Sequence, residues 1–222
     1  EHLIILIGLF ISLSTSVNYS YKYDKVTKNF EGSYHHLMIK NDVYAIWNTA
    51  EKIRQDLKNK KFFFEALPEF KREFLPSIIV GVYYYILDKE IFENKDSQLI
   101  IKEQNFKLGL LILQTLIYYF ALYILLKTLQ KNILKKQLIN KTVLTILILF
   151  LSLEPTINQF NSSYTNESIF MSMLIFLFCI LLKKKIGYFF IILSGVIVGL
   201  MFAQRPVSIF FFVPVSIFYF LI

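Results

Sequence analysis

The chain has 222 residues, of which 55% are hydrophobic and only 18% are charged. A soluble domain of this size could not bury so large an apolar fraction, so the composition indicates a protein embedded in lipid. The formal net charge of +8 does not indicate a nucleic-acid partner, because the sequence contains no basic stripe with interleaved aromatic residues. We therefore expect an integral membrane protein that binds no nucleic acid.

Apolar runs separated by short lysine-rich connections predict an all-α fold, a polytopic bundle of transmembrane helices. Two runs are long enough on their own, since 19 uncharged residues lie between Lys107 and Lys127 and another 19 between Lys185 and Arg205. The predicted spans are residues 2–18, 107–127, 137–153, 167–183, 186–204 and 206–222. The chain begins at Glu1 and stops inside the last apolar run, so we expect an N-terminal fragment consisting of a single transmembrane domain.

Lysine distribution predicts the orientation of these spans. The connections around residues 127–141 and 183–185 hold eight lysines and no acidic residue, which places them in the cytoplasm under the positive-inside rule. The long connection 19–106, the polar segment from Glu154 to Glu167 and the turn at Arg205 then lie on the outer face. We expect the polar segment near the membrane surface. This layout fits a bacterial inner membrane with an outward-facing site or an endoplasmic reticulum membrane with a lumenal site.

The long outer connection is predicted to contain two surface helices. The first runs from Asp42 to about Leu57 and is amphipathic. The second is the apolar run from Ser77 to Leu87, which is too short to span the membrane. At the start of the first helix, Asp42 is either a helix cap, a general base for an acceptor hydroxyl, or a ligand of a divalent cation. Taken alone, these residues favour the cap.

Two further polar groups are predicted on the outer face. Glu154 and Glu167 are the only acidic residues after Glu103, and they delimit a segment that is either an ordinary loop or part of a site. Arg205 is the only arginine in the last 150 residues, and it either binds a lipid-linked phosphate or anchors the chain among headgroups. No zinc-ligand spacing, glycine-rich nucleotide loop or serine-nucleophile elbow occurs, so the sequence does not indicate soluble-enzyme chemistry.

In chain order, four motifs resemble the N-terminal half of the GT-C membrane glycosyltransferases, in particular the protein O-mannosyltransferase and aminoarabinose transferase group. They are an acidic motif, a following surface helix, the segment that opens the fourth span and the turn that closes the fifth. The matching residues are Asn41-Asp42-Val43-Tyr44, Leu75-Pro76 with Gly81 and Tyr84, Ser163-Tyr164 through Glu167 to Phe170, and Gly199 through Gln204-Arg205-Pro206. One departure is Asn41, which stands where relatives often carry an acid, so Asp42 alone fills that role.

The resemblance implies transfer of a sugar from a polyprenyl- or dolichyl-phosphate donor to a lipid, glycan or protein acceptor on the non-cytoplasmic face. It implies catalytic roles for Asp42 and Glu167, with no cofactor other than a divalent cation, Mg²⁺ or Mn²⁺, at Asp42. It implies substrate-binding roles for the remaining polar residues of the motifs, namely Asn41, Tyr44, Glu154, Tyr164 and Arg205.

Two alternatives to the glycosyltransferase remain. One is a transporter or flippase for a lipid or solute, and the other is an envelope polysaccharide polymerase or ligase. Transporters commonly place ionisable groups and broken helices at mid-membrane, and no charged residue lies inside the predicted spans beyond the five residues at either end. The sequence therefore favours transfer over transport.

Overall fold

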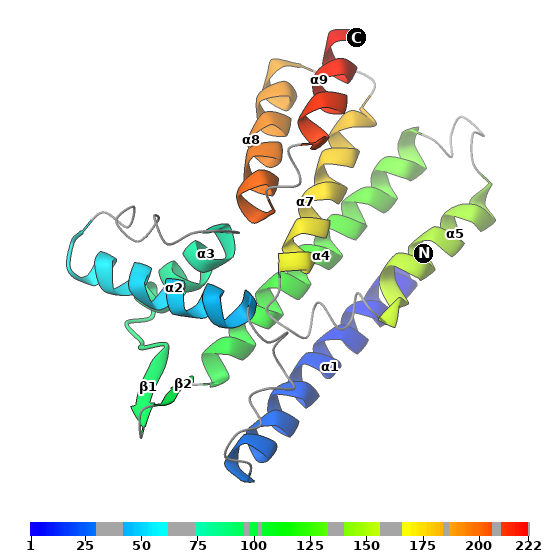
Figure 1. Cartoon of the computed structure of the whole chain (residues 1–222). Coiled ribbons are helices and arrows are strands. Elements are labelled where there is room, and N and C mark those ends of the chain that lie inside the picture. Colours follow the sequence, from blue (N-terminus) through cyan, green and yellow to red (C-terminus); the bar gives the residue numbers. More distant parts are fainter. Residues whose placement is uncertain are drawn as a thin grey trace.

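The computed structural model describes residues 1–29, 42–61, 74–95, 98–101, 104–132, 140–155, 166–183, 187–205 and 210–221. This part of the chain forms eight helices and one antiparallel two-stranded sheet (Figure 1). The elements are α1 (His2–Asn29), α2 (Asp42–Lys58), α3 (Phe74–Ile86), β1 (Phe92–Lys95), β2 (Gln98–Ile101), α4 (Gln104–Asn132), α5 (Lys141–Leu153), α7 (Asn166–Leu181), α8 (Tyr188–Gln204) and α9 (Phe212–Leu221). The fold is helical as predicted, apart from the hairpin.

Among the described residues, a short hairpin is the one exception to the predicted all-α fold. Its strands pair with Phe92 opposite Ile101 and Lys95 opposite Gln98. The strand β2 is rich in β-branched and aliphatic residues, which suit an extended chain, but four residues are too few to produce a clear alternating pattern in the sequence. The hairpin connects α3 to α4.

Helices occupy all six ranges that were predicted as spans: α1, α4, α5, α7, α8 and α9. The first continues to Asn29, so the outer connection does not begin at residue 19 as we expected. Among the described residues, one helix is long and apolar enough to cross a membrane, Leu108–Asn132 within α4. At the other ranges the apolar helices, or in α1 the apolar part His2–Val17, have 17 residues or fewer, so their crossing of a membrane stays a prediction.

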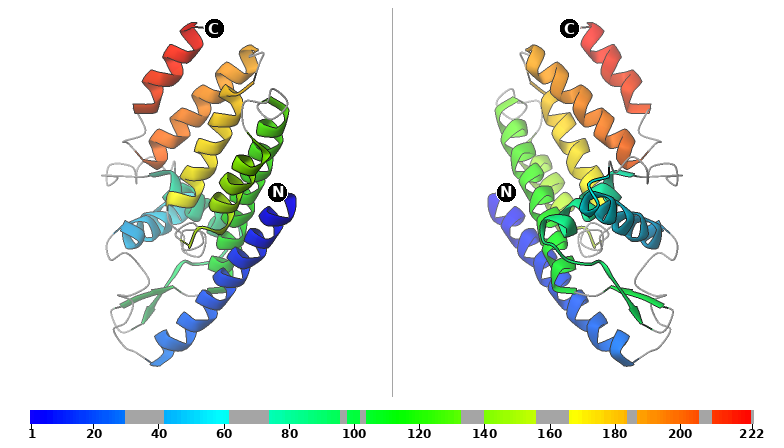
Figure 2. Two further views of the ribbon diagram at one scale, coloured as in Figure 1. Left: turned by 90° about the vertical axis from the view of Figure 1, so that its right-hand side faces the viewer. Right: turned by 90° about the vertical axis from the view of Figure 1, so that its left-hand side faces the viewer.

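The long helices lie side by side and share one polar end. Figure 1 shows that α4 and α7 run in one direction, with α5 and α8 in the opposite direction, and both views in Figure 2 agree. The start of α7 and the end of α8 therefore lie at the same end of the bundle. The surface helices α2 and α3 lie against this end (Figures 1 and 2). This arrangement is the one expected if the predicted outer segments share a face.

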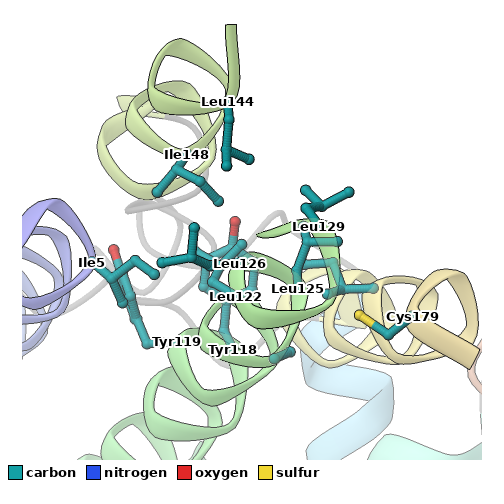
Figure 3. Close-up of a cluster of buried hydrophobic side chains, with 12 residues drawn as sticks. Ile5, Tyr118, Tyr119, Leu122, Leu125, Leu126, Leu129, Leu144, Ile148 and Cys179 are labelled. Atoms are coloured by element: carbon teal, nitrogen blue, oxygen red, sulfur yellow. The ribbon is translucent and has the colours of Figure 1, made fainter. Parts of the chain in front are cut away.

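The centre of the bundle is α4, whose buried leucines recur at the three- and four-residue spacing of one helix face. These side chains pack between α5 and α7, and α1 covers a neighbouring face (Figure 3). The cluster consists of Ile5, Tyr118, Tyr119, Ala121, Leu122, Leu125, Leu126, Leu129, Leu144, Ile148, Ile175 and Cys179. The lone cysteine is thus a buried core residue.

The surface helices α2 and α3 form one tightly packed unit. The predicted first surface helix is confirmed as α2, and its buried residues Ala50 and Ile53 face Val80 and Tyr84 of α3. Close contact depends on Gly81, because a Cβ atom added there would lie 2.7 Å from the carbonyl oxygen of Ala50. The same cluster includes Leu110 and Leu111 of α4 and Ile169 of α7, so the unit is anchored to the bundle.

A hydrogen bond to an ion pair of α2 ties the residue before the hairpin to this unit. The Arg54 Nη2 and Nε atoms donate to the two carboxylate oxygens of Glu51 over 2.6 and 2.9 Å, and the backbone N–H of Ile91 donates to Glu51 over 3.2 Å. The hydrogen bond from Arg54 to Glu51, with the nearby acids Asp88 and Glu90, raises the pKa of the guanidinium above its usual value. Arg54 is therefore a permanently charged structural residue at every accessible pH.

The helix α5 ends beside the middle of α4. The Tyr118 hydroxyl donates to the carbonyl oxygen of Leu151 over 2.7 Å, and the Tyr119 hydroxyl donates to that of Ser152 over 2.8 Å. The two tyrosines are the fifteenth and sixteenth residues of the 29-residue α4. In Figure 3 their oxygens point away from α4, Tyr119 toward α1 and Tyr118 toward α5. Thus α5 covers only about half of its neighbour.

Candidate functional site

The polar end of the bundle contains an ion pair between two predicted site residues. Glu167 lies in the first turn of α7, and Arg205 directly follows α8. The Arg205 Nη2 donates to Glu167 Oε1, and the two side chains remain 35% and 23% exposed. The guanidinium carbon also lies 5.9 Å from the ring centroid of Phe170, within the range of a cation–π contact. The result is a guanidinium that is held on one side and accessible on another.

Helix geometry favours each charge of this pair. The unpaired N–H groups at the start of α7 stabilise the negative charge of Glu167, and the unpaired carbonyls at the end of α8 stabilise the positive charge of Arg205. The backbone of Arg205 leaves the helix in an extended conformation, while its N–H still donates to the Met201 carbonyl over 2.8 Å. The preceding Gln204 is fully buried. These contacts fix the position from which the guanidinium extends.

The start of α2 lies at the same end. Ile46 is buried in the cluster that also holds Ile169, and these residues are one turn after Asp42 and two residues after Glu167. The first turn of α2 therefore lies near the start of α7, within the same buried cluster. Figure 1 shows this end of α2 beside the bundle and its other end directed away from it. The structure thus gathers three predicted segments, at Asp42, Glu167 and Arg205.

Several predicted residues are described only in part. Asn41 and Tyr164 lie outside the described residues. For Asp42 and Tyr44 the structure gives the helical backbone but not the side chain. The choice between cap, base and metal ligand for Asp42 therefore stays open. Within the side chains that are described, no group of three or more His, Cys, Asp or Glu residues could hold a metal ion.

The surroundings of Glu154 are formed by the end of α5 and by α4. This residue directly follows α5, and its backbone N–H donates to the Phe150 carbonyl over 3.0 Å. Its side chain is half-buried and interacts electrostatically with Tyr118. Asn132 at the end of α4 donates to the Leu182 carbonyl just after α7, so α7 begins at about the level along α4 at which α5 ends. Glu154 and Glu167 therefore lie at similar depths, and the expectation that the polar segment lies near the membrane surface stays a prediction.

Sequence reasoning gave no role to three aromatic residues. Phe170 was given no role beyond ending one of the four motifs. It lies one turn after Glu167 in a helix, so its ring lies on the same helix face as the Glu167 side chain. Tyr118 and Tyr119 were treated as apolar residues of a span. Their position in the sequence indicates a role, because a hydroxyl in the centre of an uncharged run needs a hydrogen-bond acceptor nearby. The sequence does not show which residue supplies that acceptor.

No protein-family model, curated protein or solved structure matches this chain.

Proposed function

We propose that the chain is part of a polytopic membrane glycosyltransferase. It transfers a sugar from a polyprenyl- or dolichyl-phosphate donor to an acceptor hydroxyl on the non-cytoplasmic face. The observation that carries the proposal is the Glu167–Arg205 ion pair at the end of the bundle where α2 begins. Its cation is suited to a lipid-linked phosphate.

Exposed apolar side chains support the membrane part of the proposal. Soluble monomers rarely expose contiguous apolar patches of this extent, because contact between apolar surface and water is unfavourable. Contact with lipid removes this unfavourable free energy. The exposed side chains lie mainly on α1, α5, α8 and α9. The most exposed of them include Leu3, Phe10, Ile146, Phe150, Phe189, Ile192, Phe210, Phe212 and Phe220. Six membrane crossings, through α1, α4, α5, α7, α8 and α9, account for these surfaces.

The proposed reaction inverts the sugar at its anomeric carbon. The acceptor oxygen forms a bond to that carbon while the bond from the carbon to the phosphate oxygen breaks. Asp42 takes the proton of the acceptor hydroxyl, as a general base. The electron pair of the broken bond leaves with the lipid phosphate, and Arg205 stabilises the added negative charge. Glu167 holds Arg205 in place through the ion pair.

Sugar transfer by the full-length protein in proteoliposomes tests this proposal. With a polyprenyl-phosphate hexose donor, we expect Arg205→Met to lower the turnover rate by about 10²- to 10³-fold, the effect of losing one transition-state donor. Lys131→Met, which removes a cation at the opposite end of α4, is the matched control and should retain turnover. Turnover of Asp42→Asn at the wild-type rate would exclude Asp42 as the base.

One observation favours a second function, a transporter or flippase. Short or interrupted helices line the binding sites of many transporters, and α5 has only 13 residues. Transport predicts movement of a lipid-phosphate sugar across the vesicle membrane without a covalent product. Transfer predicts a glycosylated acceptor. The same proteoliposomes distinguish the two, because donor flux and product are measured separately.

A further inference from the structure

One face of α4 is exposed along much of its apolar length. Its exposed side chains recur every three or four residues, which is the spacing of a single helix face. They are Leu113, Leu116, Phe120 and Tyr123, and we call them the α4 strip. From Leu113 to Tyr123 the helix rises by about 15 Å, half of the hydrocarbon core of about 30 Å. The strip therefore matches the acyl layer of one leaflet in length.

The helices α1 and α7 border the α4 strip. On the α1 side, the ring centroids of His2 and Tyr123 lie 5.7 Å apart. On the α7 side, the ring centroids of Phe120 and Phe176 lie 6.3 Å apart. The helix α5 packs on the buried face of α4 instead. The strip is therefore a continuous exposed surface between two helices.

The end of the strip nearest the lysine-rich connections carries a group of hydrogen-bond donors. Lys127, one turn after Tyr123, is the first charged residue after the uncharged stretch of α4, and its Nζ lies 5.6 Å from the centroid of the Tyr123 ring. His2 of α1 lies beside the same ring. An ammonium, a phenol hydroxyl and an imidazole N–H can all donate to one anion. Two helices thus place three donors around one ring.

The surroundings of these donors contain little negative charge. The helices α4 and α5 have no acidic residue, and Lys127 forms no salt bridge with any residue that the structure describes. Next to His2 in the sequence, Glu1 accepts a hydrogen bond from Thr145 of α5 over 3.3 Å. A second copy packed on the strip would bury Lys127 without an acid from its own α4, which is unfavourable. An anionic phosphate supplies the missing charge.

We infer that the α4 strip binds one anionic phospholipid, whose acyl chain lies along the strip and whose phosphate binds Lys127, Tyr123 and His2. Lysine is a common phosphate ligand in proteins. Basic side chains next to apolar helix surfaces attract anionic lipids of the cytoplasmic leaflet, and the lysine-rich connections predict that this end faces the cytoplasm. The lipid site rests on the membrane part of the proposed function and not on sugar transfer.

Binding of a fluorescent phosphatidylglycerol to the full-length protein in detergent tests the lipid site. Fluorescence anisotropy gives the Kd, and unlabelled phosphatidylglycerol and phosphatidylcholine are the competitors. We expect Lys127→Met to weaken binding about fivefold, the effect of one lysine on an anionic lipid. Tyr123→Phe removes only the hydroxyl and should weaken binding about two- to fivefold. Lys127→Arg keeps the charge and should retain binding.

Lys131→Met is the matched control. Lys131 is exposed on the same face of α4, one turn after Lys127 and two turns after Tyr123, so its loss should leave the Kd unchanged. Equal losses from the two lysine variants would show diffuse attraction to the lysine-rich end and overturn the site. Competition by phosphatidylcholine as strong as that by phosphatidylglycerol would overturn it too, as would displacement by inorganic phosphate at the same concentration. Size-exclusion chromatography identifies folded variants before titration.

A second copy of the chain on the strip would give another pattern. The labelled lipid would not bind, and Phe120→Glu would convert a dimer into a monomer in light scattering, which also overturns the lipid site. Failure of the proposed function is distinguishable, because sugar transfer is measured separately in proteoliposomes. Selective binding of phosphatidylglycerol by a protein without sugar transfer refutes the glycosyltransferase and retains the lipid site. Sugar transfer without selective lipid binding refutes the lipid site alone.

Discussion

Substitution of Gly81 by alanine should separate α2 from α3. The new Cβ atom would lie 2.7 Å from the Ala50 carbonyl oxygen and 3.0 Å from both Cβ and Cγ2 of Ile53. The first contact is with backbone, which cannot rotate away, so α2 itself must move by several tenths of an ångström. Overpacking of this kind lowers the free energy of unfolding by about 1–3 kcal/mol. The better helix propensity of alanine restores about 0.5–1 kcal/mol of it.

The net loss of about 1–2 kcal/mol should appear as increased opening of the α2–α3 unit. Trypsin can report it, because Lys58, Lys60 and Lys61 are exposed at the end of α2. When opening is fast relative to cleavage, the cleavage rate follows the open population, so we expect a rise of about 5- to 30-fold.

Gly199→Ala in α8 is the matched control, since nothing lies within 4 Å of its added Cβ atom. It should leave the cleavage rate unchanged or slightly lower. Cleavage of Gly81→Ala at the wild-type rate would refute the close packing of α2 on α3.

Three further substitutions test separate contacts. Tyr119→Phe removes the hydroxyl shared by Ser12 and Ser152 and should lower the free energy of unfolding in detergent by about 0.6–2 kcal/mol. Glu51→Ala removes the carboxylate that pairs with the Arg54 side chain, which is only 7% exposed, and should lower the free energy of unfolding by about 3–5 kcal/mol. The double variant with Arg54→Met should recover most of this loss. Asn132→Leu removes the 2.8 Å bond to the Leu182 carbonyl and should cost about 1 kcal/mol by the same measurement, with no change expected at the outer end.

Apolar runs bounded by charge made the helices predictable. The start of α2 at Asp42 and the end of α8 at Gln204 followed from the residues at those positions, because charge and helix-cap chemistry act locally. The extension of α1 to Asn29 did not follow, because residues 19–29 are polar and give no apolar period. Tertiary or solvent contacts, rather than a sequence pattern, determine whether such a segment stays helical.

The sequence identified residues of the candidate site, but it did not show which of them contact one another. Glu167 and Arg205 were both selected, yet their ion pair depends on the antiparallel packing of α7 and α8, which no single motif encodes. The contacts at the end of α5 were missed for a similar reason. The Tyr118 and Tyr119 hydroxyls that bind its last carbonyls are far away in sequence.

The dependence of α5 on its neighbours bears on how the protein is made. In the proposed membrane protein, a helix of 13 residues inserts poorly by itself, because its last carbonyls have no partner within the helix. The tyrosines that bind those carbonyls belong to α4, which emerges from the ribosome first. We expect α4 to remain beside the insertion machinery until α5 arrives, and the two to enter the bilayer as a helical hairpin, with α1 already in place to receive Ser152 against Gly8.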